Sequence, residues 1–572
     1  MRTYRIFILM CTFLVIFSLL LGKIFYYQIV CGEKITKAAT TMRSKQITLK
    51  EYSRGSILDR NSLPLTDNSF TQALYGLPFE IARVNQNGDK INKPEIFNHL
   101  ADELKEQGIS LDKEAVVTNL TEAMEKGNPI VRVANNLTST DIDKLNSSNL
   151  SGVVTAPLIK RYDGYCSHIV GYVKGVNDNE GVVGIEKQYN QFLGGNSKSP
   201  ELVSVLDARG RAIQGLMFKI RENENYKQGS VVLTIDKRIQ QIVEESMDKR
   251  IIKGAVVVMD IKSKEILAIA SRPNFNPYDL PRVINDSIDS PLTNRALSRF
   301  HPGSLFKILV AAAALEEKIV SVDDTFYCEG SYKFTDNLSI SCWHEKGHGS
   351  INFVKAFANS CNPTFIEVGL KLKREKLQEY AAKLHVTDDT INGWLETSPR
   401  KSYVDISPGP AGIGNACLGQ QGVMLTPVQL ANLIATIANN GKWGTPSIVK
   451  YTMDAEGHRH LPPATLFEQV ISVDTAQKVQ MLMEEVVTGG TGKTASLTSV
   501  RVAGKTATSQ TGNYTENEEE ILNTWFGGYF PADNPKWSIV VMAEEGTSGA
   551  VDAAPVFKDI ASGILELFSA ID

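Results

Sequence analysis

The chain has 572 residues, of which 42% are hydrophobic and 22% are charged, a composition typical of a folded protein with several domains. Its formal net charge is −4, so we expect no nucleic-acid partner. An apolar run over residues 6–30 comes first in chain order; Lys23 interrupts it, and Arg2 and Arg5 precede it. A run of this length can span a bilayer.

The flanks of this run predict its topology. No small-residue cleavage site follows the apolar core, which favours a retained anchor over a cleavable signal peptide. The positive N-terminal flank is expected to stay in the cytoplasm. We therefore predict that residues 1–30 form a cytoplasmic stub and a transmembrane helix. The protein would be a single-pass, type II protein of the cell membrane, with the bulk of the chain extracytoplasmic.

Residues 31–228 form the next expected domain. They mix short strands with polar helices predicted over 94–108 and 112–127, and they contain no catalytic cluster. We interpret this segment as an elongated α/β pedestal, similar to a dimerisation domain, that holds the rest of the chain away from the membrane.

The pattern changes near residue 228 and predicts a last domain over 229–572. The domain begins with a strand at 229–236, an amphipathic helix at 237–251 and a β-hairpin at 254–271. Later strands and a final helix are expected at 500–512, 523–531, 536–545 and 554–571. Strands early and late around a helical middle predict an α+β fold, with one antiparallel sheet flanked by helices.

Three short stretches of this domain place polar side chains where folding alone does not need them. They are Ser304 with Lys307, Ser360 with Asn362, and Lys505 with Thr506. The first pair opens an apolar helix, one turn apart on the same face. Each stretch alone has an ordinary explanation: a helix N-cap with a surface lysine, a helix end before a proline, and an edge strand.

The ordered set Ser-x-x-Lys, Ser-x-Asn and Lys-Thr resembles the motifs of penicillin-binding proteins. Longer stretches are similar to the class B, monofunctional branch, of the elongation or sporulation type. They are RGSILDRNSLPL (54–65), GIEKQYNQFLGG (184–195), NRALSRFHPGSLFK (294–307), GHGSINFVKAFANSCN (347–362) and QQGVMLTPVQLANLIATIANNG (420–441). The resemblance covers nearly the whole chain from residue 45. It implies a serine-type D,D-transpeptidase that cross-links peptidoglycan and is acylated by β-lactams, without a cofactor for catalysis.

The resemblance also implies roles for the first two motifs. Ser304 is expected to be the nucleophile of a covalent relay. Lys307 would take its proton, if burial lowers the pKa of the lysine. Ser360 would pass protons towards the leaving amine, and Asn362 would orient Lys307 and the substrate amide.

The third motif is expected to bind substrate. Lys505 and Thr506 would hold the terminal carboxylate, and the backbone N–H groups of Ser304 and Thr508 would form the oxyanion hole. The chain departs from the family at Ala507, where the family usually has glycine. We expect the methyl group to narrow the cleft or shift the strand, and so to affect β-lactam affinity and antibiotic resistance more than the reaction type.

Four metal-ligand side chains lie close together in sequence: Cys328, Cys342, His348 and Cys361. Two interpretations stay open, a disulfide with a spare thiol and a structural Cys₃His zinc site. We favour zinc, because three cysteines leave one unpaired and His348 lies in a glycine-rich turn; some class B relatives resemble this. His344 is an alternative ligand. The metal would brace the Ser-x-Asn motif and would not activate water.

Other functions were weighed against transpeptidation. A membrane-anchored β-lactamase would need a base for a deacylating water, and no suitable glutamate motif lies between 362 and 505. A penicillin-binding sensor usually has more membrane spans, and an inactive scaffold would be expected to lose Ser304 or Lys307. The expected partners are peptidoglycan stem peptides on lipid-linked precursors, β-lactams, the membrane and a polytopic glycosyltransferase. Elongation, division and sporulation all stay open.

Overall fold

The computed structural model describes residues 2–32, 34–35, 44–48, 54–84, 93–128, 130–148, 150, 152–174, 180–194, 201–205, 219–221, 228–286, 288–396 and 401–569. The chain forms two compact units: residues 1–53, 69–160 and 196–226, and residues 54–68, 161–195 and 227–572. Two segments of the expected pedestal, 54–68 and 161–195, thus pack into the second unit. The predicted boundary between 31–228 and 229–572 stays a prediction, because a domain that is continuous in sequence need not coincide with a compact unit.

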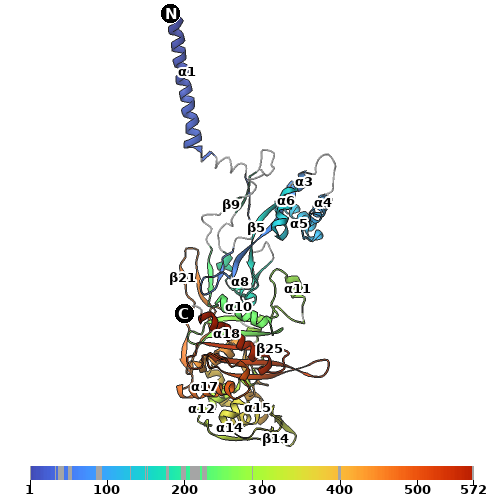
Figure 1. Ribbon diagram of the computed structural model, residues 1–572, viewed down its shortest axis with the longest axis vertical. Helices are drawn as coiled ribbons and strands as arrows, with labels where there is room; N and C mark the ends of the chain where they lie inside the picture. The colour runs from blue at the N-terminus through green and yellow to red at the C-terminus, as the bar shows by residue number, and fades with distance from the viewer. Residues whose placement is uncertain are drawn as a thin grey trace. The chain divides into compact units, whose positions relative to one another are not determined.

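The N-terminal helix α1 spans Arg2–Phe25, and a π-helical turn continues it to Val30 (Figure 1). Within the described part of the chain, Tyr4–Val30 is the one helix long and apolar enough to cross a membrane. Its large apolar side chains are exposed. This agrees with the anchor helix predicted from the sequence.

The described residues of the first unit also form two small sheets and the helices α3 to α6. One sheet has the strand order β4-β3-β5 and the other β1-β8-β9. The elements are β1 (Ser44–Thr48), β3 (Thr66–Gly76), α3 (Pro78–Val84), α4 (Lys93–Glu106), α5 (Lys113–Glu125), β4 (Val131–Leu137), α6 (Ser139–Ser147), β5 (Val153–Tyr162), β8 (Glu201–Val205) and β9 (Lys219–Arg221). Helices α4 and α5 match the two helices predicted from the sequence. Asp112 caps α5 by accepting a hydrogen bond from the backbone of Ala115.

The second unit is built on a five-stranded antiparallel sheet of order β12-β11-β25-β24-β23. Its strands are β11 (Gly254–Asp260), β12 (Ile266–Arg272), β23 (Ala503–Tyr514), β24 (Glu520–Phe530) and β25 (Trp537–Ala543). Strands β11 and β25 are almost continuously apolar because both faces of the sheet are covered. The sheet combines early and late strands of the domain, as predicted.

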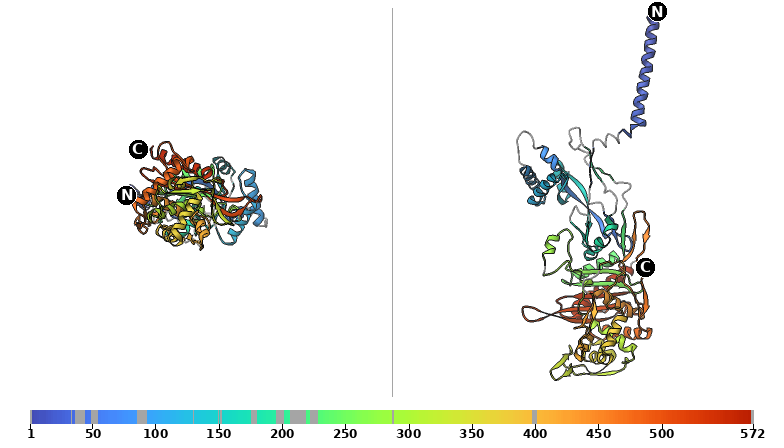
Figure 2. Two further views of the ribbon diagram at one scale, coloured as in Figure 1. Left: turned by 90° about the horizontal axis from the view of Figure 1, so that it is seen from below. Right: turned by 180° about the vertical axis from the view of Figure 1, so that it is seen from behind.

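Helices cover both faces of this sheet (Figures 1 and 2). Helices α10 (Lys237–Asp248) and α18 (Ala554–Ser569) pack on one face, around Phe526 and Phe530. The larger core lies on the other face, and α12 (Lys307–Glu316) is buried along almost its whole length there. The main helices of that side, besides α12, are α13 (Phe353–Ala358), α14 (Asn362–Lys383), α15 (Pro410–Cys417), α16 (Pro427–Ala438) and α17 (Val473–Thr488).

Short elements complete the second unit. They are β2 (Ile57–Leu58), α7 (Ser167–Val170), β6 (Tyr172–Val173), β7 (Gly181–Val183), α8 (Gly184–Gln188), α9 (Asn190–Gly194), β10 (Ser230–Leu233), α11 (Leu280–Ile284), β13 (Thr325–Cys328), β14 (Ser331–Thr335), β15 (Leu338–Ser341), β16 (Gly349–Asn352), β17 (Tyr403–Val404), β18 (Val423–Met424), β19 (Lys442–Gly444), β20 (Val449–Met453), β21 (Arg459–His460) and β22 (Phe467–Gln469). The pairs β13–β16 and β14–β15 form two small ladders before α13.

Candidate active site

Ser304 lies in a 3₁₀ turn, Gly303–Leu305, immediately before α12. The sequence predicted a helix from Ser304 onwards, whereas the α-helix itself begins at Lys307. Gly303 has φ 54°, a value that favours glycine, and a β-carbon there would lie 2.8 Å from the carbonyl oxygen of Thr508. This close approach places Ser304 beside the edge strand β23.

Lys307 is fully buried and donates to the Ser-x-Asn motif. Its Nζ atom is 2.9 Å from the Ser360 carbonyl oxygen, 3.2 Å from Ser360 Oγ and 2.8 Å from Asn362 Oδ1. Ser360 Oγ in turn donates to Ser304 Oγ at 2.9 Å. Among the described residues, no hydrogen bond joins Lys307 Nζ directly to Ser304 Oγ. Ser360 therefore links the two residues.

The site holds two buried lysines with lowered pKa values. Burial lowers the pKa of Lys307 to about 8, and the nearby cysteines oppose this shift. Lys505 is also fully buried; burial and then the charge of Lys307 hold its pKa well below the usual value. Its Nζ atom donates to the carbonyl oxygen of Thr506 at 3.0 Å. A lowered pKa is the condition under which a lysine can accept a proton near neutral pH.

The loop that carries Ser360 is held from outside the motif. Ser360 has φ 55°, which is uncommon for a residue other than glycine, and it connects α13 to α14. Asn362 Nδ2 donates to the carbonyl oxygen of Ser341 at 2.9 Å. Trp343 Nε1 donates to the carbonyl oxygen of Asn359 at 2.7 Å. The segment at and after β15 thus fixes the loop from one side.

The third motif lies on β23. Register pairs Ala507 with Trp525, so the Ala507 methyl group and Lys505 share the sheet face of Trp525. Thr506 and Thr508 point to the opposite face. Ala507 is 4% exposed and belongs to the larger core. The methyl group therefore lies inside the protein and not beside the two threonine hydroxyls.

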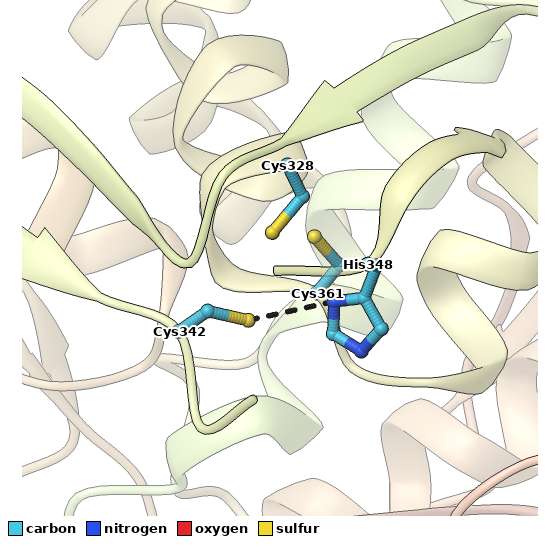
Figure 3. A group of neighbouring side chains, drawn as sticks. All are labelled: Cys328, Cys342, His348 and Cys361. Carbon is cyan, nitrogen blue, oxygen red and sulfur yellow. Dashed lines mark hydrogen bonds between the residues drawn. The ribbon is translucent and has the colours of Figure 1, made fainter. Parts of the chain in front are cut away.

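The predicted metal ligands converge (Figure 3). The Sγ atoms of Cys328, Cys342 and Cys361 and a ring nitrogen of His348 all lie within 4.8 Å of one another. Cys342 Sγ is 3.7 Å from His348 Nδ1. His344, the alternative ligand, is not in this group; its Nδ1 donates to the carbonyl oxygen of Gly347 at 2.8 Å.

The chemistry of this cluster fits a zinc ion. The three thiols are buried and free, and three sulfurs with one imidazole nitrogen form a ligand set typical of closed tetrahedral zinc sites. A hydrogen bond from the Cys361 thiol lowers the pKa of Cys342, and the same contact raises the pKa of Cys361. A deprotonated thiol is the form that binds a metal. Cys361 lies between the two residues of the Ser-x-Asn motif, so a metal here would hold that motif.

Sequence reasoning missed two residues that support the motifs, Trp343 and Thr491. Thr491 Oγ1 is 2.6 Å from Thr506 Oγ1, and the backbone N–H group of Thr491 donates to the carbonyl oxygen of Ala358 at 3.1 Å. The sequence gives one indication of the role of Trp343, namely its position directly after the candidate metal ligand Cys342. Thr491 lies in the run TGGTG, which carries no chemical signal of its own.

Two family models match this chain. Residues 254–562 match the family described as penicillin binding protein transpeptidase domain, and residues 50–224 match the penicillin-binding protein dimerisation domain. The chain is 32% identical over 573 residues to stage V sporulation protein D of Bacillus subtilis, which covers 96% of this chain and 83% of that protein.

More distant relatives are similar along the same length. Peptidoglycan D,D-transpeptidase FtsI of Escherichia coli is 25% identical over 582 residues, covering 98% of this chain and 91% of that protein. A crystal structure of the D,D-transpeptidase domain of a peptidoglycan glycosyltransferase from Eggerthella lenta superposes with a TM-score of 0.60 at 27% identity. The matched region covers 73% of this chain and 94% of the Eggerthella lenta chain.

Proposed function

The chain belongs to the class B penicillin-binding proteins, which are serine-type D,D-transpeptidases, and on that premise we propose how its own residues cross-link peptidoglycan. The substrate is the D-alanyl-D-alanine end of a stem peptide. Ser304 accepts the acyl group, the terminal D-alanine leaves, and the amine of a second stem peptide takes the acyl group from Ser304. A β-lactam acylates the same serine.

Activation of Ser304 runs through Ser360. In the structure Lys307 Nζ donates to Ser360 Oγ, which donates to Ser304 Oγ. When Lys307 is neutral, it keeps its bonds to the Ser360 carbonyl oxygen and Asn362 Oδ1. The other two bonds then reverse, so that Ser304 Oγ donates to Ser360 Oγ and Ser360 Oγ donates to the lone pair of Nζ. The Ser304 proton then passes to Ser360 Oγ as the Ser360 proton passes to Lys307 Nζ. Ser304 Oγ forms a bond to the carbonyl carbon during this transfer.

The same path returns the proton. When the amide C–N bond breaks, the ammonium of Lys307 donates through Ser360 Oγ to the departing amine of D-alanine. The incoming amine of the second stem peptide later gives up a proton along this path, and Ser304 leaves protonated. The buried position of Lys307 supports both directions, because a pKa of about 8 makes gain and loss of the proton nearly balanced.

Lys505 and Thr506 bind the terminal carboxylate of the substrate. Lys505 does so through Nζ, whose protonated form the arriving carboxylate favours, and Thr506 does so through a hydroxyl hydrogen bond. The backbone N–H groups of Ser304 and Thr508 stabilise the tetrahedral oxyanion, and each such donor contributes about 3–4 kcal/mol. The approach of Gly303 to the Thr508 carbonyl supports this pair, since it brings the two backbones together.

Cys328, Cys342, His348 and Cys361 would hold a structural zinc ion. Bound there, the metal would keep the Ser-x-Asn loop in place and would take no part in the reaction. The observation that supports this assignment is the convergence of all four ligand atoms within 4.8 Å. The role of these four residues is to position the motif, because Cys361 lies between Ser360 and Asn362 and holds the backbone of both.

Helix α1 anchors the chain in the membrane with its positively charged start in the cytoplasm. Residues 31–228 then act as a pedestal, and residues 229–572 act as the transpeptidase domain outside the membrane. An anchored enzyme of this kind can reach stem peptides on lipid-linked precursors at the outer surface of the membrane. Its partner is a membrane-embedded glycosyltransferase.

The hydrogen-bonded series Lys307–Ser360–Ser304 is the observation that carries this proposal. It is tested by treating the detergent-solubilised full chain with penicillin and measuring the intact mass. We expect one adduct on the wild type and none on Ser304→Ala. Lys307→Ala should also remain unmodified while keeping its melting temperature. An equal adduct on Ser304→Ala would overturn the assignment.

A further inference from the structure

The contacts of Thr491 point to a positioning residue for carboxylate recognition, which neither the motifs nor the family description assigns. We propose that Thr491 orients the hydroxyl of Thr506 towards the substrate carboxylate and ties it to the Ser-x-Asn side of the site. This inference rests on the proposed function, in which Thr506 binds that carboxylate.

Thr491 is attached to the end of α13. It lies in the loop between α17 and a 3₁₀ turn, Lys493–Ala495. Its N–H group donates to the Ala358 carbonyl oxygen at 3.1 Å. A β-carbon on the preceding residue, Gly490, would overlap the same carbonyl oxygen. The loop therefore packs against a backbone position two residues before Ser360.

The hydroxyl of Thr491 reaches the other side of the site. Its Oγ1 atom is 2.6 Å from Thr506 Oγ1 and 3.3 Å from the Ala358 carbonyl oxygen. A hydroxyl has one proton to donate and two lone pairs. When Thr491 donates to Ala358, the proton between the two threonines must come from Thr506. In that state Thr506 has no proton left for a ligand.

A bound carboxylate reverses this arrangement. Carboxylate oxygens only accept hydrogen bonds, so they draw the Thr506 proton outwards. Thr491 can then rotate its own proton from the 3.3 Å contact to the 2.6 Å contact with Thr506. The Ala358 carbonyl oxygen keeps its bond from the Thr491 N–H group, so no polar group loses its partner. The result is a chain of two aligned hydroxyls ending on a charge, in which each bond strengthens the next.

Removal of the Thr491 hydroxyl therefore weakens carboxylate binding without touching the nucleophile. Valine has the same shape as threonine and lacks the hydroxyl, while serine keeps the hydroxyl. We expect Thr491→Val to raise the dissociation constant of a penicillin about fivefold to tenfold, as the loss of one hydrogen bond in a charged chain implies. The rate constant for acylation from the bound state should stay unchanged, and Thr491→Ser should restore binding.

The test compares penicillin with its methyl ester, which lacks the charged carboxylate. Binding and acylation constants are measured separately on the full chain by stopped-flow kinetics, for wild type, Thr491→Val and Thr491→Ser. We expect the valine variant to lose affinity for the acid and not for the ester. The same substitution should have no effect in a Thr506→Val background, because Thr491 acts through Thr506.

The inference would be overturned if Thr491→Val lost the same affinity for the ester as for the acid. It would also be overturned if Thr491→Val lowered the affinity as much in the Thr506→Val background as in the wild type. If Thr491→Val lowers the melting temperature, Thr491→Ala and Thr491→Ser provide the same comparison. A wild type that penicillin does not acylate would overturn the proposed function and this inference with it. An acylated wild type with equal losses would overturn this inference alone.

Discussion

The hydroxyl of Ser360 donates a hydrogen bond to the hydroxyl of Ser304 across 2.9 Å. Ser360 also accepts from the buried Lys307 at 3.2 Å, so it stands between the nucleophile and a lysine that donates to it. Its backbone has φ 55°, an unfavourable value that the surrounding contacts maintain. A serine held in this way suits proton transfer in both directions.

Replacement of Ser360 tests this relay. We expect Ser360→Ala to lower the acylation rate constant at least about 100-fold, because a positioned acid–base group contributes at least that much. The rate is measured by rapid-quench kinetics with penicillin. Ser147→Ala, an exposed serine of the first unit, is the control and should behave as wild type. A Ser360→Ala variant that is acylated at the wild-type rate would mean that Lys307 reaches Ser304 directly.

The pH dependence of acylation reports on Lys307. Burial lowers the pKa of Lys307 to about 8, and only the neutral amine can take a proton. The acylation rate constant should therefore rise with pH through a midpoint of about 8 and level off above it. Lys307→Arg, which stays charged, should be inactive at every pH. A rate that is flat between pH 6 and about 9 would contradict a base of this kind.

Removal of zinc should destabilise the protein and slow acylation together. The ligands are scattered in the unfolded chain, so the metal stabilises the folded state. We expect a strong chelator to lower the melting temperature and the acylation rate, with Cys361→Ser the most damaging single change. Cys166→Ser, a buried cysteine outside the cluster, is the control.

The rival disulfide gives the opposite result. Elemental analysis would then find no stoichiometric zinc, one thiol of the cluster would react in the unfolded protein, and reductant would destabilise the protein where chelator does not. Reductant-treated protein that contains little zinc and ignores chelators would exclude the metal site.

Ala507→Gly should change the spacing of the site. The methyl group lies on the sheet face that carries Ser509, and a β-carbon on Gly303 would lie 3.3 Å from the Ser509 β-carbon. Removal of the methyl group should relax the packing of β23 on this face, which also carries Lys505, and so raise acylation rates for some β-lactams. Glycine in a strand also costs about 0.5–1 kcal/mol of stability. Unchanged rates across several β-lactams would show that the methyl group has no influence on the cleft.

The parts of the protein that follow from local pattern were predictable. The apolar run of α1, the helices α4 and α5, and the antiparallel sheet from early and late strands all agree with the sequence analysis. The three motifs were assigned through the resemblance to penicillin-binding proteins, and the four candidate metal ligands were predicted from residue type and spacing; the structure brings these four side chains together. The structure brings the motif residues Ser304, Lys307 and Ser360 into hydrogen-bond contact.

The remaining features depend on contacts between distant segments. The position of Ser360 between Lys307 and Ser304 requires a left-handed backbone, which no residue type at 360 signals. Nothing in the sequence distinguishes Thr491 from other threonines, because its role depends on contacts with β23 and the end of α13, which only the folded chain brings together. The packing of 54–68 and 161–195 into the second unit likewise follows from tertiary structure and not from the order of segments.

The identity of the acylated serine is the central claim, and peptide mapping tests it most directly. Trypsin should release Ser304 in the peptide FHPGSLFK (300–307) and Ser360 in AFANSCNPTFIEVGLK (356–371). After penicillin treatment of the full chain, the account predicts the adduct mass on the first peptide and an unmodified second peptide. An adduct on the second peptide, with the first unmodified, would make Ser360 the nucleophile and contradict the account.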